Sequence, residues 1–458
     1  MPEHLRALVV ILVLASFFFA FVRRPASDFV DSPVFIRWRN LWFALTLVAF
    51  LVHSFWAYVA LAGLFLAITA QREQRLLALF FFLLFLIPSA SARIPGFGMV
   101  NYFFDLNHPR LLALTILLPA FLLIRGRNDA PGFGRLWPDR LLLAYLLLTI
   151  GLQLRETSVT DMLRQAFYSF IDIFLPYYIA SRSLHDTAGF RQTLFAYLLA
   201  ALLLSLLAVF ETTRHWLLYR ALVDALGLTW GYGGYLGRSD LLRASVTTGQ
   251  AIALGYAIMV AIGFYLYLHP VVRNRWRRRL VGGLLAAGLA AALSRGPWVG
   301  AAALLATYLA TGRNALRRLM LLVMAGLLAL PLLTVLPGGE KVINLLPFIG
   351  KTETENIDYR QRLLDNAAIV IKRNLWFGSV NYRDTPEMRA MVQGQGIIDI
   401  VNSYVGIALS YGLVGLGLFV GFFALVLLGI RRAYRKIPDP DDEIRRLGRA
   451  LFSQLVGI

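Results

Sequence analysis

The stretch Leu293-Ser294-Arg295-Gly296-Pro297-Trp298-Val299-Gly300-Ala301-Ala302-Ala303-Leu304 decides how the rest of the chain is interpreted. It places Arg295 in a short turn between two apolar runs, 280–293 and 298–311, which we interpret as membrane helices. An arginine at a helix end in a membrane needs a partner, such as a lipid headgroup, a carboxylate or a diphosphate, because an unpaired charge in hydrocarbon is unfavourable. The alternative is an arginine that only extends its side chain to the membrane interface.

The amino-acid composition predicts a membrane protein. Of its 458 residues, 58% are hydrophobic and 16% are charged, and apolar runs of about 15–25 residues recur along nearly its whole length. These runs are continuous and do not alternate as the strands of a membrane barrel must, so we expect no strands. The sequence therefore predicts an all-α, polytopic membrane protein with a single transmembrane domain over 1–458.

We expect about twelve transmembrane helices. They are placed at 5–22, 41–70, 76–91, 111–124, 140–154, 163–180, 190–211, 246–268, 279–293, 298–311, 317–336 and 402–430. The 41–70 stretch fits either one strongly tilted helix or two short helices around Val52-His53-Ser54. The first run leads into Arg23-Arg24-Pro25 without a small-residue cleavage site, so we expect a retained helix and not a signal peptide.

The basic residues predict the orientation of the chain. The net charge of +19 does not indicate nucleic-acid binding, because the basic residues lie in short loops, as in the cytoplasmic loops of a bacterial inner-membrane protein. The basic loops at 273–279 and 313–318 and the tail 431–458 are therefore expected in the cytoplasm. Alternation then places Arg295, the loop 212–244 and the long segment 337–401 in the periplasm.

The segment 337–401 carries basic and acidic residues in similar numbers, which agrees with a periplasmic position. Within it, 359–374 has helical spacing, with Leu363, Ala367, Ile369 and Val370 apolar. This pattern predicts an amphipathic helix that lies on the membrane surface or caps a cavity.

Arginines gather on the predicted periplasmic side. Arg243, Arg295, Arg360 and Arg362 come from the loop, the turn and the amphipathic helix. A guanidinium group pairs bidentately with phosphate oxygens and stays charged, so such a cluster suits a lipid-linked diphosphate. Anchoring to lipid headgroups is the simpler interpretation for Arg362, and likewise for Arg238.

Metal and nucleotide motifs are not found in the sequence. The six histidines are scattered, and there is neither an HExxH pattern nor a glycine-rich nucleotide loop. We therefore expect no metal and no cofactor.

Three short motifs, in this order, resemble the O-antigen ligase and O-antigen polymerase family of bacterial inner-membrane glycosyltransferases. They are Arg243-Ala244-Ser245 with Thr248-Gly249-Gln250, then Ser294-Arg295-Gly296-Pro297-Trp298-Val299-Gly300, and finally Arg360 to Gly378 followed by Asn402-Ser403-Tyr404 and Tyr411-Gly412-Leu413-Val414-Gly415-Leu416. The resemblance covers roughly 190–430.

The resemblance implies transfer of a glycan from undecaprenyl diphosphate to an acceptor hydroxyl at the periplasmic face, without a metal. It implies that Arg243 and Arg295 hold the diphosphate and that Arg360 is a further contact. The family often has a histidine where this chain has Val401. Asn402 cannot take a proton usefully near neutral pH.

Three acids are candidates for the role of that missing histidine. They are Asp399, Glu211 and Asp240, and each also has a structural interpretation as a paired, solvated or helix-terminal carboxylate. The catalytic candidates are therefore Arg243, Arg295, Asp399 and Asn402. Asp172, in the middle of an apolar run, is a secondary candidate, because acids inside membranes are often functional, although Tyr177, Tyr178 or an arginine could satisfy it.

Several functions remain open. A polymerase of repeat units for a surface polysaccharide or exopolysaccharide is favoured, with a chain-length regulator as a partner. The alternatives are a ligase that transfers the glycan to lipid A–core and a protein O-oligosaccharyltransferase. A flippase or other transporter of lipid-linked sugars is a different class, and it would predict charges spread through several helices.

Overall fold

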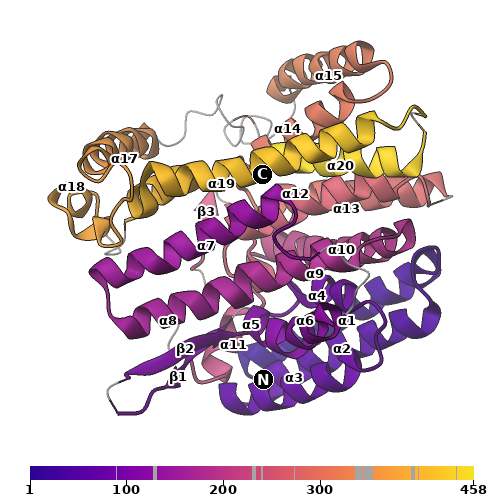
Figure 1. The fold of residues 1–458 in the computed structure, drawn as a ribbon. Coiled ribbons are helices and arrows are strands. Elements are labelled where there is room, and N and C mark those ends of the chain that lie inside the picture. Colours follow the sequence, from indigo (N-terminus) through magenta and orange to yellow (C-terminus); the bar gives the residue numbers. More distant parts are fainter. Residues whose placement is uncertain are drawn as a thin grey trace.

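The computed structural model describes residues 1–88, 90–98, 100–126, 132–228, 234–238, 241–272, 274–335, 343, 354–393, 398–400, 402–439 and 441–458. Most helices run side by side along one common direction (Figure 1). We call the end of this bundle that carries α17 (Thr354–Arg373) and α18 (Pro386–Arg389), at the left of Figure 1, the loop end.

The elements follow one another along the chain in a simple order. The first half contains α1 (Glu3–Ala26), α2 (Ser32–Leu51), α3 (Phe55–Ala70), α4 (Leu76–Leu83), β1 (Ser91–Pro95), β2 (Tyr102–Asn107), α5 (His108–Leu112), the π-helical turn η1 (Ala113–Leu117), α6 (Leu118–Arg125), α7 (Trp137–Glu156), α8 (Val159–Tyr168), the π-helical turn η2 (Ser169–Phe174), α9 (Leu175–Ser183) and α10 (Thr187–Arg214). The second half contains α11 (Arg220–Ala225), β3 (Gly237–Arg238), β4 (Leu241–Leu242), the 3₁₀ turn η3 (Val246–Thr248), α12 (Ala251–Leu268), α13 (Arg275–Ala291), α14 (Arg295–Ala310), α15 (Ala315–Val335), α17, the 3₁₀ turn η4 (Tyr382–Asp384), α18, α19 (Ser403–Arg435) and α20 (Glu443–Gly457).

The helices fit a membrane in length and in surface. Six helical stretches of the described chain are long and apolar enough to cross a bilayer: 3–26, 32–51, 108–125, 187–214, 251–268 and 403–435. The outer face of α1 exposes Val9, Val13, Phe17 and Phe21 at four-residue intervals, and lipid would cover this stripe. In contrast, α10 is buried along nearly its whole length between α4, α12 and α13.

The prediction of an all-α polytopic membrane protein is confirmed, and the count of twelve spans stays a prediction. The 41–70 stretch contains two helices, because α2 ends at Leu51 and α3 begins at Phe55. The predicted helix 76–91 is wrong over its second half. There α4 ends at Leu83 and a turn follows. Pro88 prevents a helix from continuing to residue 91, because proline lacks the N–H that a helix interior needs.

The expectation that the chain contains no strands is also wrong in detail. Two short antiparallel pairs form, β1 with β2 and β3 with β4. They lie in the connections between helices. A sequence without the alternating pattern of a membrane barrel can still form such short hairpins.

The long segment before α19 contains the predicted amphipathic helix as α17. Its buried residues Leu363, Ala367 and Val370 pack on a small core formed with η4, α18 and Leu409 of α19. Ile369, which the sequence also placed on the apolar face, is largely exposed.

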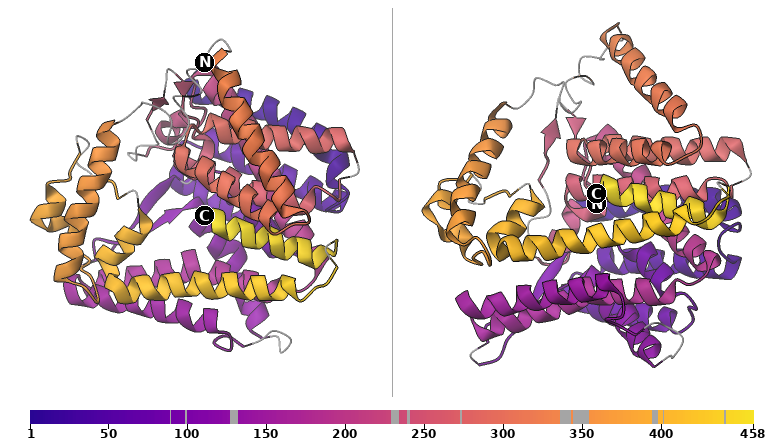
Figure 2. Two further views of the ribbon diagram at one scale, coloured as in Figure 1. Left: turned by 90° about the horizontal axis from the view of Figure 1, so that it is seen from above. Right: turned by 45° about the horizontal axis from the view of Figure 1, so that its top comes forward.

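The predicted cytoplasmic tail contains α20, which folds back along α19 and packs against α14 (Figure 2). Here two glycines allow two backbones to meet, because a Cβ on Gly457 would lie 2.6 Å from the carbonyl oxygen of Gly300. A Cβ on Gly300 would in turn overlap the carbonyl oxygen of Gly457.

Replacing Gly300 by alanine is expected to displace the end of α20, because the new methyl group meets backbone and not a flexible side chain. The chain has no native cysteine, so Ser453→Cys on the buried face of α20 provides a reporter. A thiol reagent should label this cysteine faster in the Gly300→Ala background than in the wild-type background. Gly326→Ala is the matched control, since nothing lies within 4 Å of its Cβ position, and equal labelling in all three backgrounds would contradict the expectation.

Candidate functional site

Two of the predicted arginines lie on neighbouring turns. We call the segments 241–246 and 291–295, which carry Arg243 and Arg295, the arginine turns. The N–H of Ala244 donates to the carbonyl of Ala291 over 3.1 Å. Arg238, on β3, donates through Nη1 to the carbonyl of Leu293 at 3.1 Å. Both Arg243 and Arg295 are half-buried, and Arg295 is the first residue of α14.

Glu211 anchors the first arginine turn. Its carboxylate is fully buried near the end of α10 and accepts three backbone N–H groups. Oε1 accepts the N–H of Leu218 at 2.9 Å, and Oε2 accepts those of Ser245 at 3.0 Å and Val246 at 2.9 Å. The structural interpretation of Glu211 therefore fits the geometry, since the carboxylate holds the backbone two residues after Arg243.

Both arginine turns contain strained backbone. Val246 has φ of 44° and Leu293 has φ of 45°, in the left-handed region that residues with a Cβ rarely adopt. Such conformations persist only where the surroundings enforce them, and they occur often at functional sites. The Glu211 bond to the N–H of Val246 is one such constraint.

Two substitutions at Leu293 should separate strain from packing. Leu293→Ala and Leu293→Gly both remove the buried side chain, but only glycine adopts the positive φ without a Cβ clash. We expect the glycine variant to be more stable than the alanine variant by about 1 kcal/mol. Denaturant unfolding of the two variants in the same micelles measures this difference, and an alanine variant of equal or greater stability would rule out strain at this turn.

A cavity of about 690 Å³ is lined by residues of α12, α17, α19 and α20. Its polar lining includes Arg360 of α17, Asn402 and Ser403 at the start of α19, and Tyr256 of α12. Its remaining wall is apolar and includes Phe419, Val420, Phe423, Leu427 and Leu455. The cavity therefore combines a cationic, hydrogen-bonding region with a long hydrocarbon surface.

Tyr256 connects this cavity to the second arginine turn. It lines the cavity, and its hydroxyl lies 3.3 Å from the position that a Cβ on Gly296 would occupy. Gly296 directly follows Arg295 in α14. The residue next to Arg295 and the cavity that Arg360 lines therefore contact the same tyrosine.

A second tyrosine joins α17 to the segment before α19. The Tyr359 hydroxyl accepts the N–H of Asp399 at 3.1 Å and lies within hydrogen-bonding distance of the Met391 carbonyl, at 3.3 Å. This contact places the backbone of Asp399 against α17, and Arg360, the next residue of α17, lines the cavity together with Asn402. The Asp399 side chain is exposed, while the amide oxygen of Asn402 caps α19 by accepting the N–H groups of Tyr404 and Val405.

The remaining candidates lie apart from these contacts. Asp172, in η2, pairs with Arg110 of α5 through an ion pair of 2.9 Å, so an arginine satisfies this acid. Arg362 is exposed on α17. Asp240 and Val401 lie outside the described residues.

Sequence reasoning missed Tyr256 and Tyr359. Tyr359 directly precedes Arg360, which is a weak signal, whereas nothing in the sequence marks Tyr256 within its apolar helix. Among the described residues, no group of three histidine, aspartate or glutamate side chains is placed to hold a metal ion.

Part of the chain is similar to a known protein family. Residues 280–420 match the family model described as O-antigen ligase. Neither a curated protein nor a solved structure matches the chain. The predicted resemblance is confirmed, and the match supports a membrane enzyme of the O-antigen ligase and polymerase type. The matched range contains Arg295, Arg360, Asp399 and Asn402 and leaves Arg243 outside.

Proposed function

We propose that this protein is a glycosyltransferase of the bacterial inner membrane that takes a glycan from undecaprenyl diphosphate at the periplasmic face. In this proposal it joins repeat units of a surface polysaccharide or exopolysaccharide and uses no metal. The acceptor is a hydroxyl group of a second glycan. A chain-length regulator is the expected protein partner.

One observation carries the proposal: Arg360 lines a cavity that has one polar region and one long apolar wall, and Tyr256, which also lines it, lies near Gly296, the residue after Arg295. A polyprenyl diphosphate has the same two parts, a doubly charged head and a hydrocarbon tail. Arg243, Arg295 and Arg360 would pair with the head. The aromatic and aliphatic residues of α19 and α20 would contact the first part of the tail.

In the proposed reaction, the acceptor oxygen attacks the anomeric carbon of the donor sugar. A new C–O bond forms, the bond from the anomeric carbon to the diphosphate breaks, and the leaving diphosphate keeps the electron pair. Arg243 and Arg295 stabilise the charge that develops on this leaving group. Because the Glu211 carboxylate already accepts three N–H groups, we assign the acceptor proton to Asp399, whose side chain is exposed three residues before Asn402, which lines the cavity.

Two related functions and one different class compete with this proposal. A ligase would transfer the finished glycan to lipid A–core, and a protein O-oligosaccharyltransferase would transfer it to a protein hydroxyl. The absence of the family histidine at Val401 favours the polymerase. A flippase would need charged groups spread through several helices, whereas the proposed binding residues lie in one region.

Purified protein in detergent, given a lipid-linked repeat unit, tests the proposal. A polymerase converts the repeat unit into longer lipid-linked glycans without further additions. If products form only when lipid A–core is present, the protein is a ligase. If they form only when a protein acceptor is present, it is a protein O-oligosaccharyltransferase. No transfer to any acceptor would overturn the enzymatic proposal altogether.

A further inference from the structure

A second, polar cleft of about 710 Å³ opens at the loop end, away from the α19 cavity. It lies between the start of α3, the β1–β2 hairpin and the chain that follows α11 (Figure 1). Its lining includes His53, Ser54, Trp56, Ser91, Arg93 and Asp105. This volume is within the range of about 300–1,000 Å³ that small-molecule sites occupy.

The charges in the cleft balance each other. Arg93 Nε lies 3.4 Å from Asp105 Oδ1, and these side chains are 70% and 37% exposed. A paired guanidinium and carboxylate leave little net charge to attract an ion, but they offer donors and acceptors side by side. That arrangement suits adjacent hydroxyl groups of a sugar. Trp56 is 44% exposed and adds an aromatic surface on which the C–H face of a sugar ring can lie.

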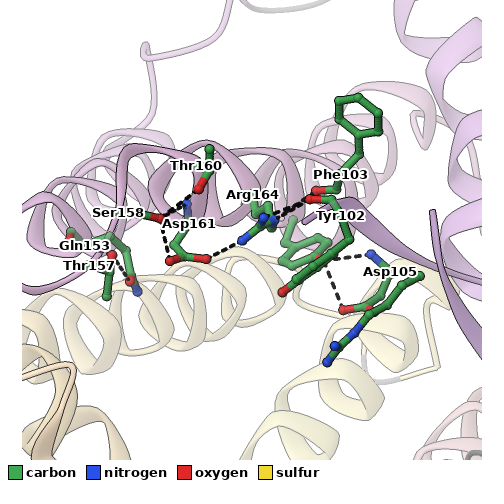
Figure 3. Close-up of polar contacts among 11 residues, drawn as sticks. Tyr102, Phe103, Asp105, Gln153, Thr157, Ser158, Thr160, Asp161 and Arg164 are labelled. Carbon is green, nitrogen blue, oxygen red and sulfur yellow. Dashed lines mark hydrogen bonds and ion pairs between the residues drawn. The ribbon is translucent and has the colours of Figure 1, made fainter. Parts of the chain in front are cut away.

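A hydrogen-bond network holds Asp105 in place. The Tyr168 hydroxyl accepts the N–H of Asp105 at 2.9 Å and donates to its Oδ2 at 3.2 Å, which leaves Oδ1 for Arg93. Arg164 donates to the carbonyl of Tyr102 at 2.8 Å and to that of Phe103 at 3.1 Å (Figure 3).

The same network orients Arg93. The ring of Tyr102 lies near the guanidinium groups of both Arg93, at 4.7 Å, and Arg164, at 3.9 Å. Arg164 also pairs with Asp161, whose carboxylate accepts the Ser158 hydroxyl at 2.7 Å (Figure 3). Asp105 and Tyr102, the two partners of Arg93, are therefore held in place before a ligand binds, which favours binding because fewer side chains have to be ordered by the ligand.

We propose that this cleft binds saccharide units of the lipid-linked glycan, at a site separate from the residues that hold its diphosphate. This inference rests on the proposed function, because that function supplies a glycan at the loop end. Arg93 and Asp105 would contact adjacent hydroxyls, and Trp56 would stack on a ring. The ligand class is an uncharged, hydroxyl-rich sugar.

Binding to two lipids tests this assignment. The probes are the lipid-linked repeat unit isolated from the source membranes and undecaprenyl diphosphate without sugar, each titrated against the purified protein. Wild-type protein should bind the glycan-bearing lipid more tightly. Arg93→Gln and Trp56→Ala should each reduce this preference by about tenfold and leave the affinity for the sugar-free lipid unchanged.

The controls separate this inference from the proposed function. Trp276→Ala removes an exposed tryptophan at the start of α13 and should change neither affinity. If both cleft variants keep the wild-type preference, or if wild-type protein has no preference, the saccharide site is overturned while the diphosphate site stands. If wild-type protein binds neither lipid, the proposed function fails and the cleft assignment fails with it.

Discussion

Arg295→Ala is expected to lower the rate of glycan transfer by about 10²–10³-fold while the protein remains folded. The reason is that the proposed role of Arg295 is to neutralise charge that appears on the diphosphate only as the glycosidic bond breaks. A group that acts in this way contributes more to the transition state than to the bound substrate, so kcat should fall more than KM rises. Single-turnover transfer from a lipid-linked repeat unit measures the chemical step directly.

Two further variants make this expectation specific. Arg295→Lys keeps the charge but loses the bidentate fork, so its transfer rate should lie between those of wild type and Arg295→Ala. Arg279→Ala removes an exposed arginine from the opposite end of α13 and should transfer at the wild-type rate. A wild-type transfer rate in the Arg295→Ala variant would show that Arg295 does not contribute to the reaction.

The boundaries of two helices could be predicted from the charged residues that flank an apolar run. The helices predicted at 279–293 and 298–311 are observed as α13 and α14, within a few residues at each end. Basic residues mark the start of α13, and Arg295 marks the turn between the two helices. The run 76–91 also lies between two arginines, Arg75 and Arg93, and there hydropathy predicted too long a helix because it does not register Pro88. Apolar residues beyond Leu83 continue the hydrophobic pattern but form a turn.

The candidate site could be predicted only in part. Topology placed Arg243 and Arg295 on one side of the membrane, and the structure places them on turns joined by a backbone hydrogen bond. The contacts of Tyr256 and Tyr359 cross from one element to another, and no local pattern reports such contacts. The same holds for Glu211, because its partners are backbone N–H groups, which every residue except proline has.

Glu211→Ala is expected to destabilise the protein by about 3 kcal/mol or more, since it leaves three backbone N–H groups without their acceptor and each such loss costs about 1–3 kcal/mol. Glu211→Gln should have a smaller effect. Its amide oxygen can still accept the N–H groups of Ser245 and Val246, while its NH₂ group would face the N–H of Leu218, where no bond can form. Denaturant unfolding in mixed micelles should therefore rank wild type above glutamine, and glutamine above alanine.

Transfer activity then distinguishes positioning from catalysis at Glu211. If this carboxylate only holds the turn that carries Arg243, the glutamine variant should keep most of the activity of each folded molecule, because the two bonds nearest Arg243 survive. A proton-transfer role would instead abolish activity in both variants, and an alanine variant as stable as wild type would contradict the anchoring role. Asp224→Ala is the matched control, since it removes an exposed acid from neighbouring α11 and should change neither quantity.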